Sequence, residues 1–221
     1  MNKTIGLTEA VETIPDGASI LIGGFLAVGA PSRLIGELVR QGRKNLTLIT
    51  NDTARPGLGV GRLIDAKAVK RIICSHIGTN PETQRQMMAG ETEVELCPQG
   101  TLAERIRAAG SGLGGVLTPT GVGTDIAEKA RKIEILGKIF LLELPISADF
   151  ALIAAHRADY LGNLDYALIA RNFNPVMAMA GTTVIAEAVE IVPVGVISPD
   201  EVVTPGVLID HLVEREKDDG R

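Results

Sequence analysis

Four short polar or glycine-rich segments each come directly after an apolar run that has the composition of a buried strand. They are residues 23–25 (Gly-Gly-Phe), 51–53 (Asn-Asp-Thr), 76–80 (His-Ile-Gly-Thr-Asn) and 98–101 (Pro-Gln-Gly-Thr). Because ligands of parallel sheets bind beyond the carboxyl ends of the strands, we expect all four segments to meet at one edge. Their amide side chains and backbone N–H groups suit the stabilisation of an oxyanion or the orientation of a carboxylate, and they contain no evident nucleophile.

The first of these segments belongs to a glycine-rich stretch that joins a short buried strand, Ser19 to Ile22, to a helix. We expect Gly23 and Gly24 to let the chain turn sharply and to leave backbone N–H groups open to a ligand. A turn between a first strand and a first helix is where α/β proteins hold phosphates and other anions. Two common versions of this loop do not fit, because Leu26 replaces a glycine of the dinucleotide fingerprint and Ala30-Pro31 replaces the Lys-Ser/Thr of a P-loop.

Strand and helix patterns alternate through the first half of the chain. The expected strands are Ser19–Ile22, Leu46–Thr50, Val69–Ser75 and Val94–Cys97, and the expected helices are Leu7–Ile14, Ser32–Gln41, Val60–Ala66, Pro81–Ala89 and Thr101–Ala109. This alternation predicts βαβ units and an open, mostly parallel twisted sheet flanked by helices.

The second half of the chain changes character. Residues 132–144 around Gly137 predict a β-hairpin, which would be an antiparallel excursion from the sheet. Phe150 to Ala155 predicts a central strand, and Val176 to Glu187 predicts a short helix and another strand. We expect the charged end, Glu214 to Arg221, to fray. We find no linker or repeat, so residues 1–221 are expected to form a single α/β domain.

Composition excludes several classes of protein. The 221 residues carry a formal net charge of −5 without a basic cluster, which argues against nucleic acid as a partner. Apolar runs stay well below the roughly 20 residues that a membrane helix needs, and the N-terminus lacks the regions of a signal peptide, so we expect a cytoplasmic protein. Cys74 and Cys97 are expected to be buried, and neither they nor His156 and His211 have the spacing of a metal site.

The stretch from Asp16 to Pro31 resembles the first signature of the family I coenzyme A transferases, in which Asp-Gly and three apolar residues precede Gly-Gly-Phe and a later Gly-x-Pro. Further segments resemble the α subunit of these enzymes, namely residues 48–53, 75–83, 98–107, 112–124, 170–175 and 203–206. The resemblance covers residues 7–213. It is greatest to the acetate, butyrate and acetoacetate transferases.

The resemblance implies a ping-pong transfer in which coenzyme A is a substrate and no cofactor is needed. A catalytic glutamate attacks the acyl-CoA thioester and then carries coenzyme A as a glutamyl thioester until a second carboxylic acid takes it. In this family the glutamate belongs to the β subunit, in a Ser-Glu-Asn-Gly context that this sequence lacks. The chain therefore resembles half an enzyme, which would work with a β subunit in an α₂β₂ or larger assembly.

The resemblance also implies roles for particular residues. Asn51 and Gln99 match positions that contact the catalytic glutamate or its acyl adduct, although each could instead cap a turn or a helix. We assign the contact with coenzyme A to the seven residues of the loop: Gly23, Gly24, Phe25, Leu26, Ala27, Val28 and Gly29. His76 could face the cleft, but a structural histidine hydrogen-bonded near Asn80 and Thr83 is favoured.

Two other functions stay open at this point. A non-catalytic module that senses phosphorylated sugars would need cations at the rim, where only Arg55 is available. A self-sufficient acyl-CoA hydrolase would need its own glutamate or a Ser/His/Asp set in the cleft, and the sequence shows neither. Glu37, Glu82, Glu104 and Glu143 fall on predicted helices or in the hairpin, where a solvated or salt-bridged role is expected.

Overall fold

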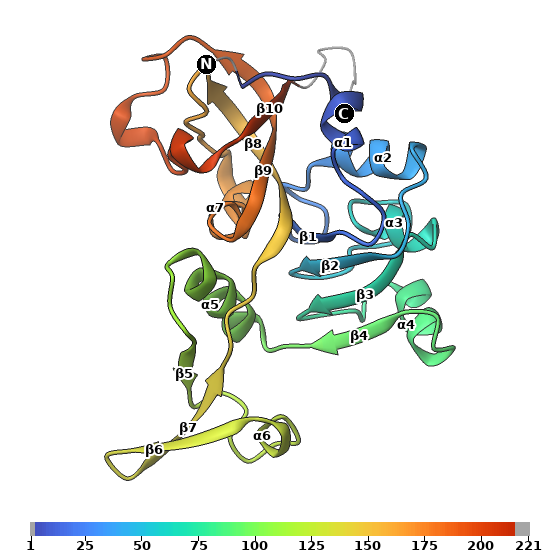
Figure 1. Cartoon of the computed structure of the whole chain (residues 1–221), viewed down its shortest axis with the longest axis vertical. Coiled ribbons are helices and arrows are strands. Elements are labelled where there is room, and N and C mark those ends of the chain that lie inside the picture. Colours follow the sequence, from blue (N-terminus) through green and yellow to red (C-terminus); the bar gives the residue numbers. More distant parts are fainter. Residues whose placement is uncertain (1–2, 215–221) are drawn as a thin grey trace.

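The structure, a computed structural model, describes residues 3–214 (Figure 1). Its main sheet has seven parallel strands in the order β10-β9-β8-β1-β2-β3-β4. Their bounds are β1 Ser19–Ile22, β2 Leu46–Thr50, β3 Val69–Cys74, β4 Glu93–Leu96, β8 Ala148–Asp159, β9 Gly181–Val192 and β10 His211–Glu214. A smaller antiparallel sheet, in the order β5-β7-β6, comprises β5 Val116–Thr118, β6 Arg131–Ile135 and β7 Lys138–Glu143.

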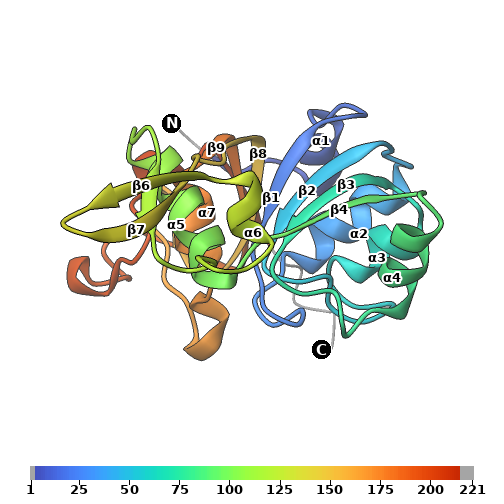
Figure 2. The same ribbon diagram turned by 90° about the horizontal axis from the view of Figure 1, so that it is seen from below.

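Helices cover both faces of the main sheet (Figure 2). One face carries α1 Leu7–Glu12, α2 Ser32–Arg40, α3 Gly61–Asp65 and α4 Pro81–Met88, and the other carries α5 Gln99–Gly110 and α7 Asn174–Ala178. The remaining helical segments are α6 Ile126–Lys129 beside the small sheet and the 3₁₀ turns η1 Leu168–Arg171, η2 Pro199–Glu201 and η3 Gly206–Leu208. The small sheet projects from one end of the molecule in Figure 1.

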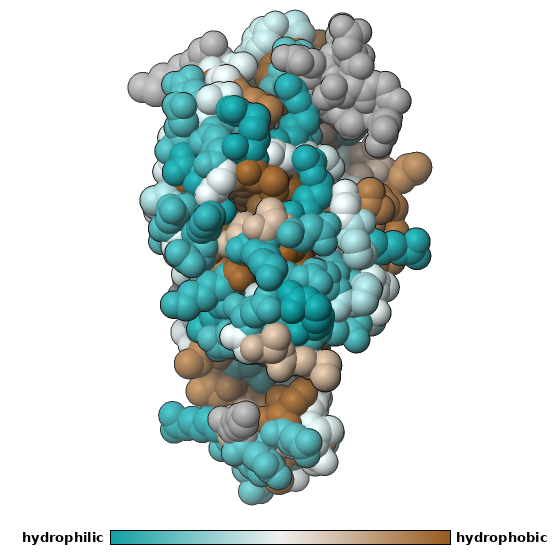
Figure 3. Space-filling view, turned by 90° about the vertical axis from the view of Figure 1, so that its right-hand side faces the viewer, coloured by the Kyte–Doolittle hydropathy of each residue, from teal (hydrophilic) through white to brown (hydrophobic). Residues whose placement is uncertain are grey.

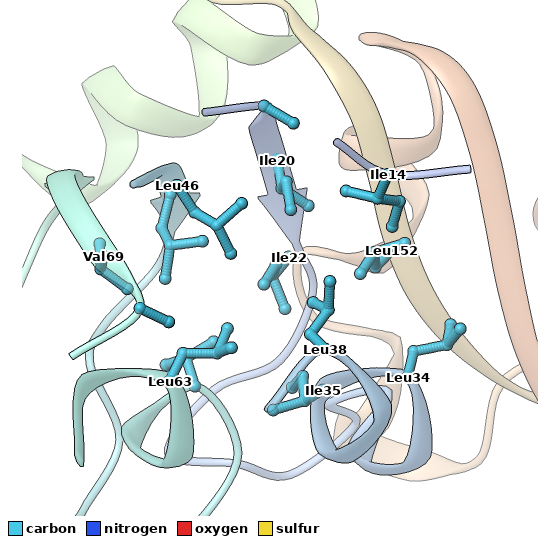
Figure 4. Packing of buried hydrophobic residues seen from close by; sticks show 14 of the residues in the cluster. Ile14, Ile20, Ile22, Leu34, Ile35, Leu38, Leu46, Leu63, Val69 and Leu152 are labelled. Carbon is cyan, nitrogen blue, oxygen red and sulfur yellow. The ribbon is translucent and has the colours of Figure 1, made fainter. Parts of the chain in front are cut away.

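Successive side chains of β1 point to opposite faces of the sheet, as they must in any strand. Ile20 and Ile22 belong to one buried cluster, to which α2 contributes Ile35 and Leu38. Leu21 belongs instead to the second cluster, which lies under α5 and α7. Figure 4 shows the first cluster, in which side chains of β1 and β2 meet those of α2 and α3. Because β1 is buried on both faces, its sequence is a nearly continuous apolar run.

The order of the strands places a topological switch point beside β1. β2, the next strand in the sequence, pairs with one side of β1, and β8, which comes much later, pairs with the other side. β1 pairs with β8 only over Phe150 to Leu152, whereas β8 pairs with β9 along its whole length to Asp159. The paired ends of β8 and β9 therefore extend past the end of β1, and a crevice of this kind is where open α/β sheets bind ligands.

Most predicted elements of the first half are confirmed, with ends that differ by about two residues or fewer. The hairpin is confirmed as β6 and β7, but β5 joins it, so the excursion has three strands. The strand predicted at Phe150 to Ala155 is longer at both ends, and α5 begins at Gln99 instead of Thr101. Strand β10, which ends at Glu214, was not predicted. The rest of the expected frayed end, residues 215–221, lies outside the described residues.

Both cysteines are buried free thiols, as predicted. Burial raises the pKa of the Cys74 thiol to about 12 and also raises the pKa of the Cys97 thiol. Both thiols are therefore protonated at neutral pH, which makes them poor nucleophiles.

The surface on the side of α2 to α4 is mostly hydrophilic, with a few apolar residues in its centre (Figure 3). Apolar residues gather at its lower end, where Figure 1 places the small sheet and α6. Ile126, Ile135 and Ile139 are among the exposed apolar residues of this region. Within residues 3–214, no helix is long and apolar enough to cross a membrane.

Candidate active site

The structure brings together the two amides that the sequence singled out. Gln99 Nε2 donates a hydrogen bond of 2.7 Å to Asn51 Oδ1, although the two residues are 48 positions apart. Asn51 follows β2 and is 1% exposed, whereas Gln99 is exposed at the first position of α5. An amide NH₂ group has two N–H donors, so one donor of Gln99 stays available beside the buried pair. Gln99 does not cap α5, whose N-cap is Pro98.

Asp52 connects this pair to the loop of residues 23–29, which we call the glycine loop. Its Oδ2 accepts hydrogen bonds from Asn51 Nδ2 at 2.8 Å and from Leu26 N at 3.0 Å. Its Oδ1 accepts from Ala54 N at 2.7 Å. Because Asp52 is 4% exposed, these bonds form in surroundings that strengthen them. The position of the loop and the position of Gln99 are thus set by one buried network.

The tip of the glycine loop is a tight hairpin in an unusual conformation. Phe25 and Val28 exchange two backbone hydrogen bonds of 3.0 and 2.9 Å, so Leu26 and Ala27 form a two-residue turn. Both turn residues have positive φ, 47° and 73°, as a type I′ turn requires. Neither is glycine, and such strained backbone persists only where surrounding contacts hold it, typically in ligand-binding segments.

Two asparagines from a distant part of the chain hold this loop. Asn172 Oδ1 accepts from Gly24 N at 3.1 Å, and its Nδ2 donates to Val28 O at 2.9 Å. Asn174, which is fully buried, donates from Nδ2 to Gly29 O at 2.9 Å. Neither asparagine was predicted to have a role, because Asn-Phe-Asn-Pro at 172–175 carries no signal beyond the family resemblance.

The expectation that Gly23 and Gly24 leave their N–H groups open to a ligand is wrong. Gly23 N donates to Leu152 O at 3.0 Å, and Gly24 N donates to Asn172 Oδ1. Within the described part of the loop, two N–H groups have no hydrogen-bond partner, those of Ala27 and Gly29. The donors that a ligand could use therefore lie at and after the hairpin tip.

The N-terminus of α2, where an anion was expected, already receives a carboxylate of the protein. Glu187 Oε2, from β9, accepts hydrogen bonds from Arg33 N at 2.9 Å and Leu34 N at 3.0 Å. A carboxylate at this place is stabilised by the partial positive charge of the helix end. It occupies the backbone donors that a phosphate would otherwise use.

Replacing Gly24 by valine is expected to destabilise the loop. Gly24 has a φ of 120°, and an added Cβ would lie 3.1 to 3.2 Å from atoms of Ala30. Strained backbone of this kind costs about 1–3 kcal/mol, so Gly24→Val should lower the free energy of unfolding by about that amount in denaturant titration. Gly6→Val is the matched control, because Gly6 has extended backbone and no atom within 4 Å of its added Cβ. Equal free energies of unfolding for the two variants would contradict the prediction that valine is strained at position 24.

A cavity of about 640 Å³ lies between the first turn of α5 and β5, and its lining includes Gly100, the residue that follows Gln99 in the sequence. The lining also includes Thr101, Glu104 and Thr118, and this volume lies in the usual range for small-molecule sites. Thr101 is 5% exposed, and its hydroxyl has no hydrogen-bond partner within the described residues. A buried polar atom without a partner is uncommon, so Thr101, the last residue of the predicted polar segment 98–101, is a candidate binding residue.

The remaining ionisable candidates from the sequence are His76 and four glutamates. His76 is exposed, and the structural hydrogen bond favoured for its side chain is absent from the described residues. Asn80 instead caps α4, where its Oδ1 accepts from Glu82 N and Thr83 N. The glutamates expected to be solvated or salt-bridged each pair with an arginine: Glu37 with Arg40, Glu82 with Arg85, Glu104 with Arg107 and Glu143 with Arg105.

These features define an α/β protein with a candidate ligand site at the carboxyl edge of a parallel sheet, formed by a strained glycine loop and a pair of amides. Residues 4–215 match the family model described as Coenzyme A transferase, and the chain belongs to that family. It is therefore a coenzyme A transferase, as the sequence resemblance predicted.

Curated relatives match along almost the whole chain. The acetoacetyl-CoA:acetate/butyrate CoA transferase alpha subunit of Clostridium acetobutylicum is 52% identical over 213 residues, which are 96% of this chain and 98% of the relative. One chain of the 3-oxoadipate CoA-transferase of Acinetobacter baylyi is 48% identical, and the match covers 94% of this chain and 92% of the relative.

A solved structure of an acyl-CoA transferase from Escherichia coli O157:H7, described as a thioester complex with CoA, superposes with a TM-score of 0.85. The match covers 96% of this chain and 47% of that one, so this chain spans about half its length. At 23% identity the likeness shows the fold alone.

Proposed function

We propose that this chain is the α subunit of a heteromeric enzyme that moves coenzyme A between short-chain carboxylic acids. The observation that carries the proposal is the amide pair of Gln99 and Asn51, in which Gln99 retains a spare N–H donor. The nucleophilic glutamate would come from a β subunit. The relative named as an alpha subunit supports such an assembly, which we expect to be α₂β₂ or larger and cytoplasmic.

The proposed reaction proceeds in two half-reactions. The glutamate carboxylate supplied by the partner attacks the carbonyl carbon of the acyl-CoA thioester, and the coenzyme A thiolate leaves to give a mixed anhydride. The thiolate then attacks the glutamyl carbonyl and releases the first carboxylate, which leaves a glutamyl-CoA thioester. A second carboxylate reverses these steps and departs as its own thioester.

In this scheme the groups of the α subunit position the reacting atoms. The unused N–H of Gln99 would donate to the partner's carboxylate or to the oxyanion that forms on it. Asn51 would hold the Gln99 amide in place through the 2.7 Å bond, and Asp52 would hold Asn51. The loop from Gly23 to Gly29 would contact coenzyme A, with Ala27 and Gly29 as its available backbone donors.

Short monocarboxylates are the expected substrates. The 640 Å³ cavity between α5 and β5 is lined by Glu104 and has no lysine or arginine in its lining, so a second substrate carboxylate would be unpaired there. We expect kcat/KM for acetate, butyrate or acetoacetate to exceed that for succinate or 3-oxoadipate by roughly 10- to 100-fold. Kinetics of the assembled enzyme with these five acids would test both the transferase proposal and the substrate class. A clear preference for 3-oxoadipate would contradict the substrate class alone.

A further inference from the structure

The carboxylate of Asp52 is held by two backbone N–H groups. Its Oδ1 accepts from Ala54 N at 2.7 Å, and its Oδ2 accepts from Leu26 N at 3.0 Å. A backbone N–H group donates and never accepts, so each of these bonds requires an oxygen of the side chain. Because Asp52 is 4% exposed, water has little access to replace either bond. Both carboxylate oxygens are therefore fixed in place as acceptors.

This fixed acceptor decides which way the buried amide of Asn51 points. An asparagine amide has an acceptor oxygen on one side and an NH₂ donor on the other, and a half turn exchanges the two. Only the NH₂ group can bond to Asp52 Oδ2, which lies 2.8 Å away. Ser75 Oγ lies 3.3 Å from Asn51 Oδ1, but a hydroxyl can donate or accept and so favours neither orientation. Asp52 thus turns the oxygen of Asn51 to the opposite side of the amide.

The orientation of Asn51 in turn decides what Gln99 presents. Asn51 Oδ1 accepts only, so Gln99 meets it with Nε2, at 2.7 Å. The second N–H of that NH₂ group stays available beside the pair. With Asn51 turned over, the carbonyl oxygen of Gln99 would take this place, and a carboxylate or oxyanion brought there would meet a partial negative charge. One buried amide therefore decides whether Gln99 offers a donor or an acceptor.

We propose that Asp52 is a positioning residue, whose carboxylate orients the amides of Asn51 and Gln99 so that an N–H donor faces the reacting site. The inference rests on the proposed function and deepens it, since it names the group that fixes the direction of these hydrogen bonds. Asp52 acts through the two amides and not on the substrate. Because the donor is oriented before the reaction begins, the barrier includes no cost of turning it.

The test replaces Asp52 by asparagine in the assembled enzyme, obtained by co-expression of this chain with its partner. Asparagine has one oxygen in place of two, so its NH₂ group must face the N–H of either Leu26 or Ala54. On the side of Leu26 it also faces Asn51, whose amide can then turn over. We expect Asp52→Asn to lower kcat for transfer from acetyl-CoA to butyrate by roughly tenfold or more.

Asp159→Asn is the matched control. Asp159 is 3% exposed, and it also accepts from two backbone N–H groups, those of Leu161 and Asn163, and from an asparagine amide, Asn163 Nδ2. It thus resembles Asp52 in burial and bonding, but these bonds do not include the amide pair. Asp159→Asn should lower the unfolding midpoint and leave kcat unchanged. If Asp52→Asn likewise changes only the midpoint, the positioning role is overturned.

A double-mutant cycle with Gln99→Ala separates positioning from a general loss of structure. Without the Gln99 amide there is no donor to orient, so Asp52→Asn should leave the kcat of Gln99→Ala unchanged. An equal fall in kcat with and without Gln99 would overturn the proposal. Failure of the proposed function gives a different result, because the unaltered assembly would then transfer no coenzyme A.

If Asp52→Asn does not assemble, neutron diffraction from the unaltered assembly in heavy water tests the orientation directly, because deuterium distinguishes an NH₂ group from an oxygen. We expect deuterium on the Asn51 atom that faces Asp52 and on the Gln99 atom that faces Asn51. An oxygen of Asn51 facing Asp52 would overturn the proposal.

Discussion

The purified chain alone is expected to show no coenzyme A transfer and to gain activity when a β subunit is added. Its own candidate nucleophiles are held in other roles. Hydrogen bonds from the Arg40 guanidinium lower the pKa of Glu37 to about 2, and burial keeps the thiol of Cys74 protonated by raising its pKa. Since covalent catalysis depends on an activated nucleophile, the rate of the isolated chain should lie several orders of magnitude below that of the assembly.

The measurement follows transfer from acetyl-CoA to butyrate by the chain alone and by the chain mixed with the separately purified partner. Mass spectrometry of each sample establishes which polypeptides are present. Robust transfer by a sample without detectable partner would contradict the division of the enzyme between two chains. The nucleophile would then have to lie in this chain.

Replacing Gln99 by alanine in the assembled enzyme should lower kcat by on the order of 10²-fold or more, because one positioned donor is lost from the reacting site. The stability of the protein should change little, since Gln99 is exposed and its side chain makes a hydrogen bond to Asn51 only, among the described residues. A fall in kcat without a fall in the unfolding midpoint distinguishes a role in the reaction from a role in folding.

Gln41→Ala is the matched control, because Gln41 also lies at a helix terminus, as the C-cap of α2, and bonds to another side chain, Glu37 at 2.8 Å, away from the amide pair. Its turnover should equal that of the unaltered enzyme. An unchanged kcat in Gln99→Ala would show that Gln99 has a structural role only. The amide pair would then have no part in the proposed mechanism.

The elements around the site could be predicted from the sequence because their signals are local. The bounds of β1 and β2 match the predicted ones, since apolar runs of β-forming residues end at residues that break strands. Gly42 marks the end of α2 with a φ of 69°, which glycine adopts easily. Strand β10 was missed because His211–Glu214 is short and ends in the charged tail.

The contacts that shape the site could not be predicted in the same way. Asn172 reaches Gly24 across 148 positions, and Gln99 reaches Asn51 across 48, because the sheet places distant segments together. Glu187 meets the start of α2 only because β8 and β9 lie beyond β1. No local pattern of residues predicts these long-range hydrogen-bond partners.

The sequence by itself determined the alternation of strands and helices, the glycine loop, the placement of Asn51 directly after β2 and the placement of Gln99 in the segment that follows β4. The tertiary structure decided which hydrogen-bond donors remain available. Local composition places an N–H group in a turn, but the acceptor that occupies it comes from wherever the fold brings a carbonyl or carboxylate oxygen. For this reason the N–H groups of Gly23 and Gly24 already have acceptors within the protein. Within the described loop, the N–H groups of Ala27 and Gly29 remain available to a ligand.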